Sequence, residues 1–416
     1  MKVAVIGTGI SGSVIAYNLC KDHDITVFES EGRLGGHTNT IKVSDDGHDL
    51  AIDTGFIVFN DRTYPNFIKL LEEIGQQSQL SEMSFSVQSE STGIEYCGSS
   101  LNKLFAQRSN FFRPKFYRMI YDILRFNKES FKIINSLSGS EIVSEYLVEK
   151  NYSKTFINHY LLPMSAAIWS AKPDSILDMP LKFLLNFFAN HGLLQIKNRP
   201  QWKVIKGGSY QYLDKLTMNY RDKIRLNCPV VSITRNHEGV EVESSSYGKE
   251  CFDYVFLSCH SDQALSLISD ASLIEHEILS SIPYQSNEAV LHTDDSLMPK
   301  NKKAWAAWNY FIPTESIGVA TLTYNMNILQ SLKSKKQYLV TLNNDKNINP
   351  KKILSRIKYA HPIFSLKGME MQARQEEINC DRTFFCGAYW RNGFHEDGVV
   401  SAMNALTHFN NRLNSE

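Results

Sequence analysis

The fold of this chain is decided by the stretch Val3-Ala4-Val5-Ile6-Gly7-Thr8-Gly9-Ile10-Ser11-Gly12, near the start of 416 residues. Its first four residues are apolar and predict a buried strand, and a helical pattern then runs through Cys20. A second apolar run, Ile25–Phe28, ends in the acid Glu29. Strand, glycine turn, helix, strand and acid in this order are typical of a dinucleotide-binding βαβ unit.

The residues of this motif have separate physical roles. Gly7 permits the tight turn, Gly9 lets a pyrophosphate approach the backbone, and Gly12 lets the helix and strand pack closely. The helix has Ser11 in its first turn, and its N-terminus offers free N–H groups and a positive dipole to phosphates. Glu29 can accept hydrogen bonds from ribose hydroxyls. The motif therefore predicts a dinucleotide site, without distinguishing NAD from FAD.

A second glycine-rich loop, Gly32–Thr38, follows Glu29 directly. Arg33 adds a permanent cation beside the pyrophosphate, and Gly35 and Gly36 let the backbone approach a bulky ligand. A nicotinamide site needs no such loop. Together GTGISG, Glu29 and GRLGG resemble the flavin amine oxidase superfamily, which includes monoamine oxidases, protoporphyrinogen oxidase, phytoene desaturases and a fatty-acid isomerase. This resemblance implies noncovalent FAD, with Glu29 on the adenosine ribose and Arg33 near the phosphates and flavin.

The composition limits the functional classes. Lysine plus arginine and aspartate plus glutamate both number 44, so the net charge is zero and nothing indicates a nucleic-acid partner. The seven cysteines have no CxxC spacing, which predicts neither a disulfide framework nor a metal site. No signal-peptide pattern precedes the first strand, and no apolar run reaches the ~18 residues of a membrane span. We expect a cytoplasmic protein, either soluble or peripheral on the inner face of the membrane; its oligomeric state stays open.

The predicted elements give an α/β fold, and the resemblance implies an amine-oxidase-like arrangement. In this arrangement, a Rossmann-like FAD-binding domain carries an inserted α+β substrate domain, made of a mixed sheet and a helical part. The FAD-binding domain is assembled from residues 1–60, 198–265 and 380–416. The substrate domain takes residues 61–197, which are mainly helical, and residues 266–379, which carry the predicted sheet.

Short strands and turns suggest further cofactor contacts. A predicted hairpin, Thr40–Val43 with Asp49–Ile52, leads to Thr54 and Gly55. These two residues resemble the turn with which the superfamily re-enters the flavin pocket, which implies that both contact the cofactor. In relatives a valine after a later strand holds the adenine through its backbone, and Val230 is the matching residue here.

The C-terminal stretch predicts a last strand over Thr383–Ala388, a turn, and a helix over Val399–Phe409. The superfamily closes its FAD site with such a unit, and the dipole of its final helix stabilises negative charge on the reduced flavin. The resemblance therefore implies cofactor contacts by four residues: Gly387, Glu396, Asp397 and Val399.

The superfamily's chemistry is hydride transfer from a substrate C–H bond to flavin N5. A desaturase also needs a base for the proton that leaves with the hydride. Candidates lie in stretches expected near the flavin: His395 first, and then Tyr389, His37 and Glu396. His37 is also a candidate cofactor contact, because it follows the glycine pair. The alternative for each of these residues is a structural role.

Two departures distinguish the chain from amine oxidases. The stretch Ile282–Val290 lacks the lysine that amine oxidases carry in the matching strand, and Gly387 is followed by Ala388 instead of an acid. The missing lysine argues against rapid amine oxidation with O₂. The missing acid bears on one cofactor contact and leaves the prediction of the site itself unchanged.

Within the superfamily, nearly the whole chain resembles a bacterial group of predicted NAD/FAD-binding proteins. The stretches that carry this resemblance are Met83–Val87, Ser100–Asn102, His159–Ser170, His191–Leu194, Arg199–Trp202 and Tyr389–Gly398. Such proteins resemble enzymes that act beside fatty-acyl methylating and cyclopropanating systems, including a desaturase step towards furan fatty acids. The resemblance implies a hydrophobic substrate, such as a methylated or unsaturated acyl chain of phospholipid. We therefore expect a desaturating FAD-dependent oxidoreductase. The alternatives are a double-bond isomerase, an amine oxidase and a non-catalytic flavin-binding module.

Two regions allow two interpretations each. From Phe111 to Ile134, aromatic residues interleave with cations. This pattern fits a basic amphipathic helix on an anionic membrane, or a domain helix with a solvated basic face, which is commoner. From Tyr152 to Leu194, predicted buried helices either wall a pocket for an apolar substrate or form ordinary core, which is again commoner.

Overall fold

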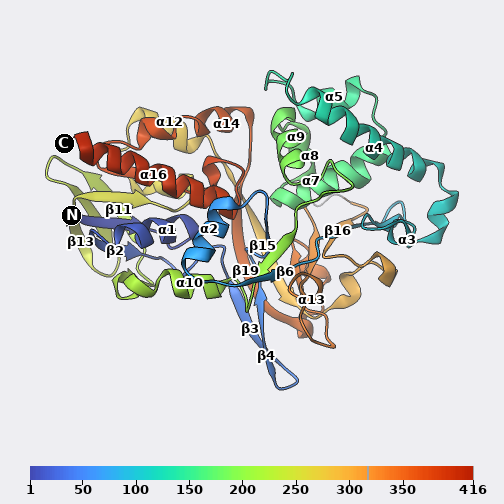
Figure 1. Cartoon of the computed structure of the whole chain (residues 1–416), viewed down its shortest axis with the longest axis horizontal. Helices are drawn as coiled ribbons and strands as arrows, with labels where there is room; N and C mark the ends of the chain where they lie inside the picture. The colour runs from blue at the N-terminus through green and yellow to red at the C-terminus, as the bar shows by residue number, and fades with distance from the viewer. Residues whose placement is uncertain (316–317, 416) are drawn as a thin grey trace.

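A parallel sheet of five strands is built from the beginning, the middle and the end of the chain, which the computed structural model describes over residues 1–315 and 318–415 (Figure 1). In spatial order its strands are β10 (Ile224–Arg225), β2 (Asp24–Phe28), β1 (Lys2–Ile6), β14 (Tyr254–Leu257) and β20 (Thr383–Phe385). Every neighbouring pair is parallel. The predicted Rossmann-like α/β fold is therefore confirmed.

Alternate residues of β1 pack into two different cores. Val3 and Val5 pack against helices on one face, whereas Ala4 and Ile6 pack on the other face against a small antiparallel sheet. The helices of the first face are α1 (Ile10–Leu19), α10 (Tyr210–Leu216) and α16 (His395–Ser415). The second face meets β11 (Val230–Arg235), β12 (Val240–Ser244) and β13 (Gly248–Phe252), with α11 (Ser261–Leu267) and α12 (Leu273–Ser280). Because both faces are covered, β1 reads as a continuous apolar run.

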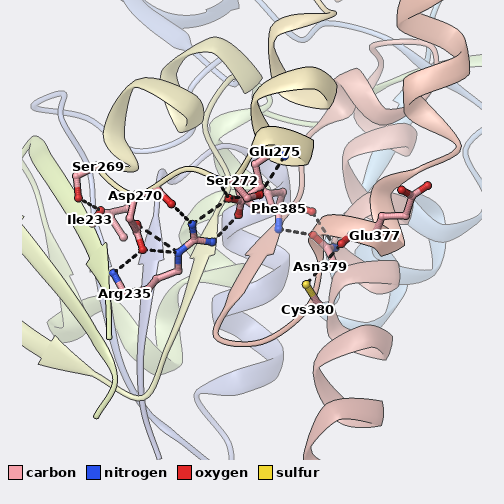
Figure 2. Close-up of polar contacts among 10 residues, drawn as sticks. All are labelled: Ile233, Arg235, Ser269, Asp270, Ser272, Glu275, Glu377, Asn379, Cys380 and Phe385. Atoms are coloured by element: carbon pink, nitrogen blue, oxygen red, sulfur yellow. Dashed lines mark hydrogen bonds and ion pairs between the residues drawn. The ribbon is translucent and has the colours of Figure 1, made fainter. Parts of the chain in front are cut away.

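An ion-pair network attaches the small sheet to α12 (Figure 2). Arg235, at the end of β11, donates from Nε to both oxygens of Asp270 at 3.3 and 3.2 Å. It also donates from Nη2 to Oε2 of Glu275 at 2.9 Å. The same Glu275 oxygen accepts the N–H of Ser272, the N-cap of α12, at 2.8 Å. The Glu275 side chain is only 4% exposed, so this network fixes a buried charge as well as a helix start.

A mixed sheet of seven strands forms the second large layer. In spatial order its strands are β19 (Ile353–Pro362), β15 (Tyr284–His292), β18 (Leu339–Leu342), β17 (Leu322–Asn325), β16 (Trp308–Ile312), β7 (Phe85–Ser89) and β8 (Glu95–Cys97). β16 and β7 pair in parallel, and the other neighbours pair antiparallel. The mixed sheet predicted from the sequence is confirmed.

Strands not expected from the sequence include β13, which pairs with β12, and β19, the edge strand that pairs with β15 along nearly its whole length. Apolar Ile357 and Tyr359 alternate in β19 with the charged Arg356 and Lys358. This alternation is the signal of a half-buried strand. The strand was missed because the segment contains few apolar residues and ends in a proline, which is uncommon inside sheets.

The helical part lies on the side of the molecule away from the N- and C-termini (Figure 1). Its helices are α3 (Leu101–Leu104), α4 (Pro114–Ile133), α5 (Val143–Glu149), α6 (Lys154–Phe156), α7 (Leu162–Trp169), α8 (Pro173–Leu177) and α9 (Leu181–Asn190), with a π-helical turn η2 (Ile157–Leu161) before α7. Phe116, Phe156 and Leu184 are fully buried in the core of this part, which also takes in residues of the mixed sheet.

The remaining elements connect these layers. They are β3 (Thr40–Asp45), β4 (His48–Asp53), β5 (Phe59–Asn60), β6 (Ser78–Leu80), β9 (Trp202–Ile205), α2 (Pro65–Glu73), α13 (Met326–Leu329), α14 (Leu366–Gln372) and α15 (Gln375–Ile378). Short 3-10 helices are η1 (Arg108–Phe112), η3 (Met218–Lys223), η4 (Asp295–Leu297), η5 (Lys302–Ala304), η6 (Asp345–Asn347), η7 (Pro350–Lys352) and η8 (Ala388–Trp390). Among the helices of residues 1–315 and 318–415, none is long and apolar enough to cross a bilayer. All seven cysteines are free thiols.

Candidate active site

A large cavity is lined by residues of both large sheets and of the helical part. Its volume is about 1570 Å³, more than the ~300–1000 Å³ that usually hold one small ligand. One end, which we call the nucleotide arm, is lined by Gly7–Ser11, Glu29, Arg33 and Gly36. The other end, which we call the apolar arm, is lined by side chains of α4, α7 and α9. The cavity is large enough for a dinucleotide and a second molecule together.

The glycine turn after β1 leaves room for a phosphate. A Cβ on Gly9 would meet no protein atom within 4 Å, although one on Gly12 would lie 2.0 Å from the carbonyl oxygen of Gly7. Gly7 itself has a φ of +98°, which glycine adopts most readily. No side chain caps the N-terminus of α1 and no acid stands in its first turn, so the helix presents unpaired N–H groups there. These residues fit the pyrophosphate of a dinucleotide; Gly12 acts by packing and does not line the cavity.

Thr8 joins Glu29 to the second glycine loop, a role that the sequence analysis missed. The N–H of Thr8 donates to Oε2 of Glu29 at 3.0 Å, and its hydroxyl donates to the same oxygen. That hydroxyl also accepts the N–H of Gly35 at 3.1 Å. Oε1 of Glu29 accepts the N–H of Glu31 at 2.9 Å. The carboxylate is thus held in one orientation in the nucleotide arm, where ribose hydroxyls can donate to it.

The second glycine loop folds back on the first. Gly35 and Gly36 have φ values of +105° and +56°, and a Cβ on Gly36 would lie 3.4 Å from Cα of Gly9. Arg33 lines the cavity, and its Nη1 donates to the carbonyl oxygen of Thr38 at 3.4 Å. The loop therefore lies against the glycine turn, and its cation faces the same cavity, where it can pair with a pyrophosphate.

The other predicted cofactor contacts divide into two groups. Gly55 lines the cavity and packs against the carbonyl of His37, from which its Cβ would be 2.1 Å away. Thr54 and Val230 are buried and are not among the residues that line the cavity. The hydroxyl of Thr54 is instead within 3.1 Å of the Tyr359 hydroxyl, so Thr54 supports the wall from behind.

The start of α16 packs on the glycine turn, as the closing helix was expected to do. The hydroxyl of Ser11 donates to the carbonyl oxygen of Gly398 at 2.9 Å. Gly387 lines the cavity, and its N–H donates to Ser401 at 3.0 Å. Tyr389 covers Gly387 closely, since a Cβ there would lie 2.3 Å from the tyrosine ring. Tyr389 also lines the cavity, so this catalytic candidate is placed where a ligand can reach it.

His395 lines the cavity but is tied into the protein. Its Nε2 lies 2.9 Å from the hydroxyl of Tyr212 and 3.0 Å from that of Thr38. These hydroxyls are 2.6 Å apart, which closes a triangle of hydrogen bonds around Nε2. The ring also stacks on Phe56 with centroids 3.5 Å apart, and burial lowers the pKa of His395 to about 3. This geometry favours a structural role over that of the first-ranked base.

Three further candidates near His395 point away from the cavity. The carboxylate of Glu396 accepts the backbone N–H groups of Asn66 and Phe67 at 3.1 and 2.9 Å, and so caps α2. Asp397 accepts the N–H of Phe394 at 2.9 Å, and burial raises its pKa to about 6. Val399 is core. None of the three lines the cavity, so catalysis by Glu396 and side-chain cofactor contacts by all three lack structural support.

A group of histidines on the cavity wall was only partly predicted. The His37 ring stacks on Tyr359 with centroids 4.9 Å apart, and lies 5.3 Å from His361 and 6.1 Å from His260. All four residues line the cavity. Burial, with these neighbouring imidazoles, holds the pKa of His37 well below its ordinary value, so the ring is neutral at pH 7. Its Nε2 is buried without a hydrogen-bond partner in the protein.

The tautomer of His361 follows from its partners. Asn287 accepts at Oδ1 from the amides of Gln285 and Asn343, at 3.1 and 2.7 Å. Its Nδ2 must therefore face Nδ1 of His361, which lies 2.8 Å away. Since Nδ1 accepts and burial lowers the pKa of His361 to about 4, the neutral ring carries its proton on Nε2. His361 could have been found from the sequence if strand β19, which contains it, had been recognised. His260 could have been found from its position just after a parallel strand, because ligands bind at the carboxyl ends of such strands.

The carboxylates that line the cavity are confined to the nucleotide arm. Within the described residues they are Glu29 and Glu31. The apolar arm is lined mainly by aromatic and aliphatic side chains, such as Ile123, Met164, Trp169, Phe187, Phe364 and Phe394. Arg199 is a cation in this region and lines the cavity near Tyr160. The apolar arm therefore suits an uncharged or anionic ligand better than a cation.

Comparison with known proteins places the chain in a family. The family described as flavin containing amine oxidoreductase matches residues 10–336, which is most of the chain. The chain belongs to this flavin-containing family. Its dinucleotide is accordingly FAD, as predicted from the second glycine loop, and the residues of the nucleotide arm would hold it.

Solved structures of the same fold agree with this membership. The cyclohexylamine oxidase of Brevibacterium oxydans is 15% identical, with 99% of each chain covered and a TM-score of 0.70. A fatty acid isomerase of P. acnes, described as producing CLA, is 14% identical, with 98% of each chain covered and a TM-score of 0.70. Identities this low show the amine-oxidase-like fold alone, and they confirm that part of the prediction.

Two curated relatives match part of the chain. The mitochondrial protoporphyrinogen oxidase of Nicotiana tabacum is 29% identical over 183 residues, and protoporphyrinogen oxidase 2 of Arabidopsis thaliana is 26% identical over 187 residues. Each match covers 42% of this chain and 34% of the relative, so the chain matches about a third of the relatives' length.

Proposed function

We propose that this protein is an FAD-dependent oxidoreductase that dehydrogenates the acyl chain of a lipid, such as a methylated or unsaturated fatty-acyl group of phospholipid. The observation that carries the proposal is the character of the apolar arm, which joins the nucleotide arm in one cavity. A long hydrocarbon gains free energy there from burial, at about 25 cal/mol per Å² of apolar surface. Arg199 supplies a cation for a carboxylate or phosphate at the polar end of such a molecule.

An amine substrate is disfavoured by the lining of the apolar arm. A protonated amine would lose its hydration in the apolar arm, where the described residues offer no lining carboxylate. The strand β15, which matches the lysine-bearing strand of amine oxidases, contains no lysine. Both observations support a lipid substrate over an amine.

Dehydrogenation of a C–C bond removes a hydride and a proton and leaves a double bond. FAD, when bound, supplies the two-electron acceptor that takes the hydride. The proton needs a neutral base on the cavity wall, and His37 meets this requirement through its neutral ring and its unpaired Nε2. His361 provides a complementary N–H donor. The dry lining of the apolar arm keeps water from the reacting carbons.

The test is an anaerobic titration of the holoenzyme with fatty acids and phospholipids that carry methylated or unsaturated chains. Loss of the visible flavin absorbance, together with a product that has one more double bond, is the expected result. A product whose double bond has moved, without net loss of absorbance, would identify an isomerase instead. Reduction of the flavin by amines, with peroxide released when air is then admitted, and no reduction by any lipid, would overturn the proposal.

His37→Gln provides the residue-level check. We expect it to keep FAD and to slow single-turnover reduction by at least tenfold, within the ~10²–10⁴-fold usual for a lost general base. His237→Gln is the matched control for the same substitution, because the His237 side chain is 91% exposed and does not line the cavity. Equal reduction rates in wild type and His37→Gln would remove His37 as the base while leaving the substrate class in place.

A further inference from the structure

Exposed apolar side chains are concentrated on one small part of the molecule. Nineteen large hydrophobic residues are exposed in the described chain, and seven of them fall between residues 101 and 131. They are Leu101, Phe111, Phe112, Tyr117, Tyr121, Leu124 and Phe131. We call this region, formed by α3, η1 and α4, the α3–α4 surface; it lies in the helical part of Figure 1. Contiguous exposed apolar patches are uncommon on soluble proteins and usually mark a contact site.

The pattern along α4 shows that this exposure is organised. Phe116, Met119 and Phe126 are buried in the core of the helical part. Tyr117, Tyr121, Leu124, Lys128 and Phe131 are spaced by four, three, four and three residues, which places them on one face of the helix. The helix thus has one apolar face for the core and a second, aromatic face for solvent, which a helix serving only as core does not need.

The charge of this surface is strongly positive. Residues 98–140 contain eight lysines and arginines and two acids, a net charge of +6 in a chain whose total is zero. Of the acids, Asp122 is fully buried and pairs with Arg118 and Arg125, and Glu129 also pairs with Arg125. Lys115, Lys128 and Lys132 are exposed beside the aromatic residues. Exposed aromatic residues among cations match the boundary between lipid headgroups and acyl chains.

The apolar arm of the cavity opens on the same surface. Leu101 and Leu124 line the cavity, yet they are 77% and 48% exposed. Ile196, from the loop before β9, lines it as well and is 70% exposed. Ile120 and Ile123 continue the lining inward along α4. A path with apolar walls therefore leads from the exposed aromatic face to the interior of the apolar arm.

We propose that the α3–α4 surface docks on a bilayer of anionic phospholipid, so that an acyl chain passes from the leaflet into the apolar arm without crossing water. The use of the opening rests on the proposed lipid substrate, whereas the docking itself rests on the surface alone. A second copy of the chain fits this surface poorly, because a twofold contact would bring two regions of charge +6 together. An anionic bilayer instead complements both the charge and the aromatic side chains.

The test is flotation of the FAD-loaded protein with vesicles of phosphatidylcholine alone or with one part in three of phosphatidylglycerol. We expect binding to the anionic vesicles that weakens as salt is raised, and little binding to the neutral ones. The triple variant Lys115→Gln/Lys128→Gln/Lys132→Gln should bind roughly 100-fold more weakly, since each basic residue near the surface contributes about fivefold. Phe112→Ser/Tyr121→Ser should also bind more weakly. Neither variant changes a residue that lines the cavity.

The matched control is Lys333→Gln/Lys335→Gln/Lys351→Gln, which removes three exposed lysines from elsewhere on the chain. It should bind vesicles like wild type. Equal binding to neutral and anionic vesicles, or equal losses in both triple variants, would overturn the docking proposal. So would an absence of vesicle binding together with a dimer in light scattering that Phe112→Ser/Tyr121→Ser dissolves.

The two proposals fail separately. With substrate dispersed in detergent, the surface variants should reduce their flavin like wild type, because no lining residue is changed. Vesicle binding without flavin reduction by any lipid would refute the proposed reaction and leave docking intact. Reduction by dispersed lipid without vesicle binding would refute docking and leave the reaction intact.

Discussion

Replacing His395 by glutamine should make the protein less sensitive to acid. The imidazole is 8% exposed and its Nε2 is held by Tyr212 and Thr38, where a neutral amide can take over the contacts. Burial lowers the pKa of His395 to about 3. In the unfolded chain the histidine binds a proton below about pH 6.5, whereas in the folded chain it stays neutral until about pH 3. Its contribution to stability is therefore complete above pH 6.5 and is lost progressively as the pH falls towards 3.

The magnitude follows from linkage. Between pH 7 and pH 5 the unfolded chain gains a proton at this site and the folded chain does not. The lower of these pH values lies about 1.5 units below the pKa of about 6.5 in the unfolded chain. At about 1.36 kcal/mol per unit, His395 removes about 2 kcal/mol of unfolding free energy on this acidification. His191 and His361, with pKa values lowered to about 4 by burial, act in the same direction. Asp53 and Asp397, raised to about 6 by burial, act in the opposite direction.

A difference measurement isolates the contribution of His395. Urea unfolding of wild type and His395→Gln, followed by tryptophan fluorescence with FAD in fixed excess, is compared at pH 7 and pH 5. Wild type should lose about 2 kcal/mol more than the variant between the two pH values, and both should bind FAD. His237→Gln is the control, because that side chain is 91% exposed. If His395→Gln loses as much stability on acidification as wild type, the conclusion that buried His395 stays neutral in the folded protein is wrong.

Five further substitutions test the site and the fold. Gly9→Val should abolish FAD binding, seen as lost visible absorbance, with an unchanged circular dichroism spectrum; Gly12→Val should instead lower the melting temperature, because its side chain meets the Gly7 turn. Glu29→Gln should weaken FAD binding about 10- to 100-fold in a fluorescence titration, as expected for hydrogen bonds to a charged group; an unchanged affinity would contradict its ribose role. Glu396→Gln should cost about 1–3 kcal/mol of unfolding free energy with FAD content preserved, because it caps α2. Arg235→Leu should cost about 3–5 kcal/mol in urea unfolding, because it leaves Glu275 buried without its partner; a loss below 1 kcal/mol would contradict the assignment of a buried charge pair.

The nucleotide arm could be predicted from the sequence because its chemistry is contiguous. Gly7, Gly9 and Glu29 belong to one βαβ unit, and the second loop with Arg33 follows without interruption. Backbone geometry within such a unit is set by local rules for glycine, helix starts and parallel strands. Thr8 escaped notice within the same motif, because a threonine there has no pattern of its own until its hydroxyl is seen between Glu29 and Gly35.

The catalytic candidates could not be ranked from the sequence. His395 and Glu396 stand in the stretch that closes the site, and sequence proximity to the flavin made them candidates. A helix start turns successive side chains in different directions, however, so Glu396 caps α2 and His395 closes a hydrogen-bonded triangle. His361, on a strand that the sequence analysis omitted, instead lies beside His37 on the cavity wall.

By itself the sequence determined the parallel sheet, the glycine turn, the FAD-type second loop and the mixed sheet, because each depends on neighbours along the chain. Tertiary structure alone decided which side chains share the cavity and where the apolar arm opens. Those depend on contacts between residues hundreds of positions apart, such as Ser11 with Gly398. The same amphipathic pattern in α4 fits a solvated face or a membrane face, and only its packing showed that Tyr117, Tyr121 and Phe131 are exposed while Phe116 and Phe126 are buried.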